Sequence, residues 1–118
     1  MTTDAREHAL QALYEFDLRN GEVGGLSGRA ERLASGVIEH MAELDETLDG
    51  VSRRWRVARM APVDRAVLRL ALYELRFEPD TPTAVVVAEA VRLAKRYSTE
   101  RSGTFVNGIL GRVSQSER

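Results

Sequence analysis

Arginines and aromatic residues occur together at two places in this chain. The first is SRRWRVARM at 52–60, in which four arginines surround Trp55, and the second is KRY at 95–97, followed by Arg101 and Phe105. Single-stranded RNA is held by cations on its phosphates and by planar side chains that stack on its bases. An arginine guanidinium can do both. Trp55 and Phe105 also fall on predicted helical stripes, so each has an alternative place in the core, which we favour for Trp55.

Residues that could carry out catalysis or bind a metal are sparse. His8 and His40 are the only histidines, and neither stands at the His-x-x-x-His or Glu-x-x-His spacing of a metal site. The glycines at 21–28 lack the preceding strand and the Lys-Ser/Thr of a phosphate loop. No Ser-His-acid set is apparent. We therefore expect no enzyme activity, no metal and no cofactor.

The length and composition indicate one intracellular domain. A chain of 118 residues suits a single domain with one hydrophobic core. It has no cysteine, which excludes disulfides and thiol chemistry. Its first ten residues do not resemble a signal peptide, and no stretch approaches the ~20 apolar residues of a membrane helix. We therefore expect a cytoplasmic protein.

The net charge of −1 hides an uneven distribution. Residues 1–49 contain four arginines and eleven acids, whereas residues 50–118 contain thirteen cations and seven acids. A basic half can attract nucleic acid, and an acidic half can meet a basic protein. A solvated surface with segregated charges explains the same pattern, so charge alone leaves both readings open.

The first half of the chain has the apolar spacing of helices. Asp4 followed by Glu7 resembles a capping box that begins a helix of about 16 residues, ended by Asn20-Gly21. A glycine-rich loop at 20–28 follows. Ser27 is the expected cap of the next helix, whose apolar residues recur every three or four positions from Leu33 to Leu48. A bend with a new cap is expected at Asp45.

The second half predicts three further helices. Pro62 is expected as the first residue of a helix that reaches Phe77. After a turn at 78–82, Thr81 caps a helix that runs to Ser98 despite the three valines at 85–87. The last helix starts near Ser102, and its glycines at 103, 108 and 111 require close packing or a nearby ligand. The predicted fold class is all-α, a compact single domain of about six to seven helices.

Four segments, in order, resemble motifs of the NusB family. They are AREHALQALYEFDL at 5–18, APVDRAVLRLALYEL at 61–75, TPTAVVVAEAVRLAKRY at 81–97 and SGTFVNGILGRV at 102–113. The resemblance covers nearly the whole chain, weakly over 20–50. It implies that residues 1–118 form one RNA-binding domain of two small helical bundles. It also implies that the chain pairs with NusE, a small-subunit ribosomal protein, binds boxA in nascent ribosomal RNA leader transcripts, and supports antitermination by RNA polymerase without catalysis.

The same resemblance implies a set of site residues. Those expected to contact RNA are Arg6, Tyr14, Arg65, Arg69, Phe105 and Asn107. Asp64 matches an acidic position at the contact with NusE, where an acid suits a basic partner. Asp64 also has a simpler explanation, because an acid in the first turn of a helix stabilises the helix.

The chain departs from the family pattern at several positions. Only Arg6 remains of an N-terminal run of arginines, so the chain alone is expected to bind RNA weakly, since phosphate contacts set affinity. Other arginines or NusE would then supply the missing contacts. Arg101 stands where the family often has an acid, and we expect it to add a cation beside Phe105. Ala88 and Thr104 replace a usual Asn and a usual basic residue.

Two other functions remain open. The first is a module like the one fused to ribosomal RNA cytosine methyltransferases, but 118 residues leave no room for their cofactor-binding domain. The second is a protein-interaction domain, possible as a homodimer, that has lost RNA binding together with its arginines. An enzyme would require a partner that completes its site.

Overall fold

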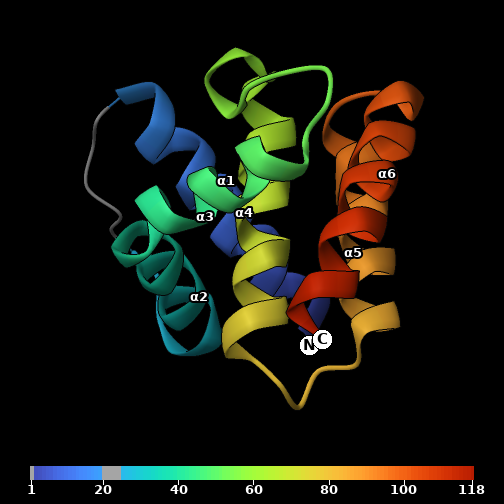
Figure 1. The fold of residues 1–118 in the computed structure, drawn as a ribbon. Helices are drawn as coiled ribbons and strands as arrows, with labels where there is room; N and C mark the ends of the chain where they lie inside the picture. The colour runs from blue at the N-terminus through green and yellow to red at the C-terminus, as the bar shows by residue number, and fades with distance from the viewer. Residues whose placement is uncertain (1, 20–24) are drawn as a thin grey trace.

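The computed structural model describes residues 2–19 and 25–118, and this part of the chain is helical without strands (Figure 1). The elements are α1 (Thr2–Arg19), α2 (Gly28–Glu39), α3 (Met41–Val51), a 3₁₀ turn η1 (Val57–Arg59), α4 (Pro62–Phe77), α5 (Thr83–Tyr97) and α6 (Glu100–Glu117). The all-α fold with six to seven helical elements is confirmed. None of the helices described has the length and apolar content that a membrane crossing requires.

Helix α4 is the centre of the fold, and all five other α-helices pack against it. Figure 1 shows α2 and α3 on one side of α4 and the α5–α6 pair on the other. Every residue from Ala66 to Leu75 is buried. Pro62 is the first helical residue, as predicted, because its missing N–H would be unpaired there in any case. A charged side chain on a helix that is buried on all sides needs a partner of opposite charge. This requirement determines the role of several arginines in this fold.

Helices α5 and α6 form a close antiparallel pair, and the run of three valines lies in α5 as predicted. Gly103 is buried, and a Cβ built on it would lie 2.6 Å from the Cγ of Lys95. This glycine therefore allows the close approach that the sequence predicts. Gly108 and Gly111 are exposed with nothing near a Cβ, so packing does not explain them.

Helices α2 and α3 meet at His40, and the bend predicted at Asp45 is wrong. His40 ends α2 with its N–H on the carbonyl of Gly36 and begins α3 by accepting from the N–H of Leu44. Its ring stacks on Phe77, with centroids 4.3 Å apart. This ring contact joins the helix junction to the end of α4.

Several predicted helix starts are shifted by one to three residues. Helix α1 begins before Asp4, which therefore cannot cap it, and α5 begins after Pro82 and not after Thr81. Helix α6 begins at Glu100, capped by Thr99, whose side chain accepts from the N–H of Ser102. Ser27 precedes α2 as predicted but makes no side-chain capping bond. The predicted stop at Asn20-Gly21 lies outside the described residues.

Candidate RNA-binding groove

A groove with a volume of about 700 Å³ lies between the loop after α3, the start of α4 and the first half of α6. Its lining residues are Arg54, Trp55, Arg59, Met60, Ala61, Asp64, Arg101, Ser102, Thr104 and Phe105. Both arginine–aromatic clusters of the sequence therefore contribute to one surface. Trp55 is 47% exposed, so the prediction that it belongs to the core is wrong. The reason is that Trp55 lies between α3 and η1 and is on no helix.

The loop wall of this groove, residues 52–60, is held in place by its backbone. The hydroxyl of Ser52 donates to the carbonyl of Trp55 at 2.5 Å. The carboxylate of Asp49 accepts from the N–H of Val57 at 2.7 Å, and the Val57 side chain is buried in the core. These contacts fix the chain on both sides of Trp55 and leave its indole ring at the surface.

Arg65 connects this wall to α1. Its Nε donates to the carboxylate of Asp17 at 2.6 Å, and its Nη1 donates to the carbonyls of Ala58 and Met60 at 3.3 and 3.4 Å. The side chain is thus occupied with holding the backbone that carries Arg59. Arg65 does not line the groove, and its position supports a structural role beside the site.

Three exposed arginines line the groove: Arg54, Arg59 and Arg101. Within the described part of the chain, the side chains of these three make no ion pair and no hydrogen bond. Arg101 lies four residues before Phe105 on α6, so the cation and the ring project from one face of the helix. Guanidinium groups without a protein partner can bind an anion without first breaking an ion pair.

Asp64 is the anionic residue of the groove. It lies in the first turn of α4, is 8% exposed, and its Oδ1 is buried with no hydrogen-bond partner among the described residues. A buried carboxylate oxygen without a donor is costly.

Comparison with known proteins identifies the family. A sequence model described as the NusB family matches residues 3–115. The transcription antitermination protein NusB of Anaeromyxobacter sp. (strain Fw109-5) is 43% identical over 127 residues, covering 95% of this chain and 88% of its own. That of Geobacillus kaustophilus (strain HTA426) is 42% identical over 120 residues, covering 93% and 92%. The chain belongs to the NusB family. Because these relatives are transcription antitermination proteins, it is not an enzyme.

Solved structures of NusB proteins have the same fold. T. maritima NusB matches with a TM-score of 0.89 and 35% identity, over 98% of this chain and 91% of that one. A structure of the antitermination factors NusB and NusE in complex with double-stranded RNA matches with a TM-score of 0.87 and 27% identity, over 98% and 96%. The fold of this chain is therefore the NusB fold over nearly its whole length.

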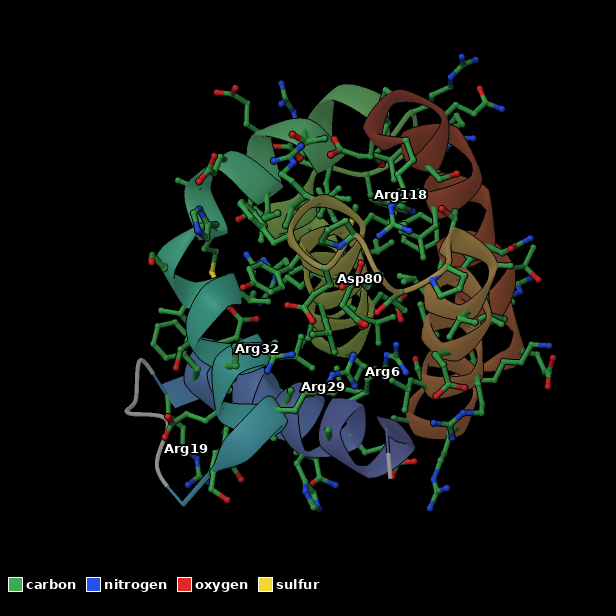
Figure 2. All side chains as sticks on the ribbon, turned by 90° about the horizontal axis from the view of Figure 1, so that it is seen from below. Arg6, Arg19, Arg29, Arg32, Asp80 and Arg118 are labelled. Atoms are coloured by element: carbon green, nitrogen blue, oxygen red, sulfur yellow. The ribbon has the colours of Figure 1, made fainter. Side chains whose placement is uncertain are left out.

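Two of the arginines that the NusB resemblance assigns to RNA lie in the interior. Arg6 is 3% exposed and donates from Nε and Nη2 to the carboxylate of Glu74, at 2.8–3.1 Å. Figure 2 shows Arg6 and Arg29 directed toward the central helix, where Arg29 also pairs with Glu74. Arg69 is buried and forms a bidentate pair with Asp45 at 2.7 and 2.8 Å.

The electrostatics of Arg69 agree with this internal role. Burial opposes its charge, but the hydrogen bonds and charges of Asp45 and Asp17 together outweigh burial and raise the pKa of Arg69 above its ordinary value. Arg6 and Arg69 both have carboxylate partners within the fold and neither lines the groove. The structure therefore offers no free guanidinium at these two positions.

The remaining NusB-type residues lie at separate places. Phe105 lines the groove and packs partly against the core, whereas Asn107 is exposed and lies outside the lining. Tyr14 borders a second hollow of about 340 Å³. That hollow is lined by Leu10, Gln11, Tyr14, Glu15, Val63 and Tyr97. Of the predicted residues, the structure brings together Asp64, Arg101 and Phe105.

The sequence shows the arginines around Trp55 but does not indicate that they belong to the site. Gly50, which weakens the helix before them, is the sequence feature that indicates an exposed loop. Helix α3 ends one residue after Gly50.

Proposed function

We propose that this chain is a transcription antitermination factor that pairs with NusE and binds boxA RNA of nascent ribosomal RNA leader transcripts. In this role it contributes to the antitermination complex on RNA polymerase, in the cytoplasm, and residues 1–118 act as one RNA-binding domain. Family membership supports the antitermination role. The match to NusB and NusE in complex with RNA supports the two partners.

The observation that carries the RNA part is a set of groove arginines that have no ion pair among the described residues and lie beside two aromatic rings. Each arginine that binds a phosphate releases counterions, which makes affinity depend on salt. A ring without a full set of protein contacts can stack on a base. We propose Arg101 and Phe105 as RNA contacts on this basis.

The other predicted contacts divide into two groups. Tyr14 and Asn107 remain proposed RNA contacts outside the groove lining, since both side chains reach the surface. Arg6, Arg65 and Arg69 act through the fold in our proposal, because carboxylates or carbonyls already occupy their guanidinium groups.

For NusE, the proposed contact is Asp64. A lysine or arginine of a basic partner would supply the donor that its buried Oδ1 lacks. Asp64→Lys should then weaken pairing with NusE at least tenfold, because it places like charges together. The conservative control is Asp64→Asn, which keeps the shape and should lose less. A dissociation constant for Asp64→Lys equal to that of the wild type would contradict the contact.

The decisive experiment measures RNA binding with and without NusE. Fluorescently labelled boxA RNA is titrated with the purified pair at low salt. It should bind the pair more tightly than it binds either protein alone, and its affinity for the pair should fall as the salt concentration rises. A scrambled RNA of the same length is the control for sequence preference. A pair that forms but ignores RNA at low salt would leave this chain as a protein-interaction module.

A further inference from the structure

We propose that residues 54–59 form a nucleotide subsite, in which one unstacked RNA base lies on the indole ring of Trp55 while Arg54 and Arg59 bind the adjoining phosphates. The subsite rests on the proposed RNA-binding function and adds to it a segment outside the four segments that carry the resemblance. It commits to single-stranded RNA, since a base paired in a duplex has no free face to offer.

Trp55 is exposed and faces the groove. Tryptophan has a large aromatic side chain, and Trp55 is 47% exposed, so apolar surface remains in contact with water. The ring lines a groove of about 700 Å³, which is spacious enough for a nucleotide. Phe105 also lines that groove, so the base that leaves water at Trp55 enters a partly apolar space.

The backbone of the segment is already held by hydrogen bonds. Ser52 bonds both the carbonyl and the N–H of Trp55, Asp49 holds the N–H of Val57, and Arg65 holds two carbonyls at 58 and 60. Binding therefore does not have to order this backbone. Preorganisation of this kind lowers the entropic cost of association.

The charges along the segment are unevenly distributed between the groove and the outer surface. Arg54 and Arg59 face the groove without a carboxylate partner in the described structure, whereas Arg56 lies 3.6 Å from Asp49 and is not part of the lining. Asp64 lies in the same groove and repels phosphate. The backbone of the RNA is therefore directed to the arginine wall, and its base toward the rings.

The subsite also replaces cations that the chain lacks elsewhere. Only Arg6 remains of the N-terminal arginine run, and its guanidinium is paired with Glu74. Arg54 and Arg59 supply two phosphate contacts from another element, which accounts for RNA binding without that run.

The test uses the fact that Trp55 is the only tryptophan of the chain. The protein, in complex with NusE, is excited at a wavelength that selects tryptophan, with a NusE variant free of tryptophan where needed. It is titrated with single-stranded boxA RNA and with the same RNA annealed to its complement. Stacking should quench and shift Trp55 emission with the single strand and much less with the duplex.

Variants in the segment then test the contacts one by one. Trp55→Ala should weaken binding of single-stranded RNA by about 5- to 150-fold, and Trp55→Phe should restore part of it. Arg54→Gln with Arg59→Gln should lower the slope of log affinity against log salt by about 1.4. Arg53→Gln is the matched control, because Arg53 is exposed on the same loop but does not line the groove. Circular dichroism of each variant checks folding.

The outcomes separate this subsite from the proposed function. If the wild-type pair binds RNA but Trp55 emission stays constant and Trp55→Ala binds equally well, the subsite is wrong and the proposed function stands. If the wild-type pair binds no RNA at low salt, the proposed function fails, and the subsite with it. Equal salt slopes for the double arginine variant and the wild type would contradict the two proposed phosphate contacts.

Discussion

The arginines of the groove and the arginines around α4 are chemically identical but have opposite surroundings. Arg54, Arg59 and Arg101 face solvent without a carboxylate in the described structure, whereas Arg6 and Arg69 are buried against carboxylates. The first set is available to an external anion, and the second holds helices together. An arginine in a nucleic-acid motif can therefore be structural when a carboxylate from a distant part of the chain pairs with it.

The largest effect on stability is expected when a buried carboxylate is removed. Glu74→Gln leaves Arg6 buried beside a neutral group and should lower the free energy of unfolding by about 3–5 kcal/mol. Urea denaturation measures this. The control is Glu78→Gln, since Glu78 pairs with the exposed Arg32 and should contribute about 0–1 kcal/mol. Equal effects of the two variants would show that burial does not distinguish these pairs.

A second prediction concerns Arg69. Arg69→Ala removes a bidentate bond to Asp45 and should cost about 2–3 kcal/mol of stability. It should leave the salt slope of RNA binding unchanged, because this guanidinium does not face the groove. Thermal melting and RNA titrations at several salt concentrations check both parts. A reduced slope in the folded variant would support the sequence-based assignment of Arg69 to RNA.

A smaller effect is expected at Arg101, where RNA binding should change and stability should not. Arg101→Gln should leave unfolding unchanged within about 0.5 kcal/mol, because its side chain is exposed and unpaired in the described structure. It should reduce the salt slope by about 0.7 and weaken RNA binding several-fold. Arg96→Gln serves as the control, since Arg96 is also exposed but lies near Glu7, outside the groove.

The smallest effect is expected from pH. Tyr97 donates a hydrogen bond to Glu7 at 2.8 Å and, with Arg92 and Arg96 nearby, lowers the pKa of Glu7 below its usual 4.5. A lowered folded-state pKa gives stability that is present above pH 4.5 and is lost as the pH falls through the folded value. Glu7→Gln should therefore flatten the pH dependence of unfolding in that window. Glu46→Gln, at an exposed position, should not.

The sequence predicts the helices well because burial leaves a periodic record in it. The stripe from Val63 to Phe77 predicts α4, and Pro62 marks its first residue. Helix ends are less well predicted, since caps such as Thr99 depend on side-chain geometry that similar residues nearby could also supply. The bend at His40 depends on a contact with Phe77, far along the chain.

The site is only partly predictable, for a related reason. Arg101, Phe105 and Asp64 line the same groove, although the resemblance assigns Phe105 to RNA and Asp64 to NusE, and Arg101 departs from the family pattern. Whether an arginine is free depends on carboxylates that lie far away in sequence, and Arg6 and Glu74 are 68 positions apart. The core prediction for Trp55 is wrong because its apolar type favours the core, whereas the loop that holds it is fixed through Ser52 and Asp49.

In the loop of residues 52–60, the groups that anchor the loop differ from the side chains that it exposes. Its attachments are made by backbone groups and by the inward side chain of Val57, while the outward side chains at 53 and 54 make no contact that the described structure requires. Those outward positions can therefore be exchanged at little cost in folding. The loop is thus a place where the chain can be retuned, by evolution or by an engineer, toward a different transcript.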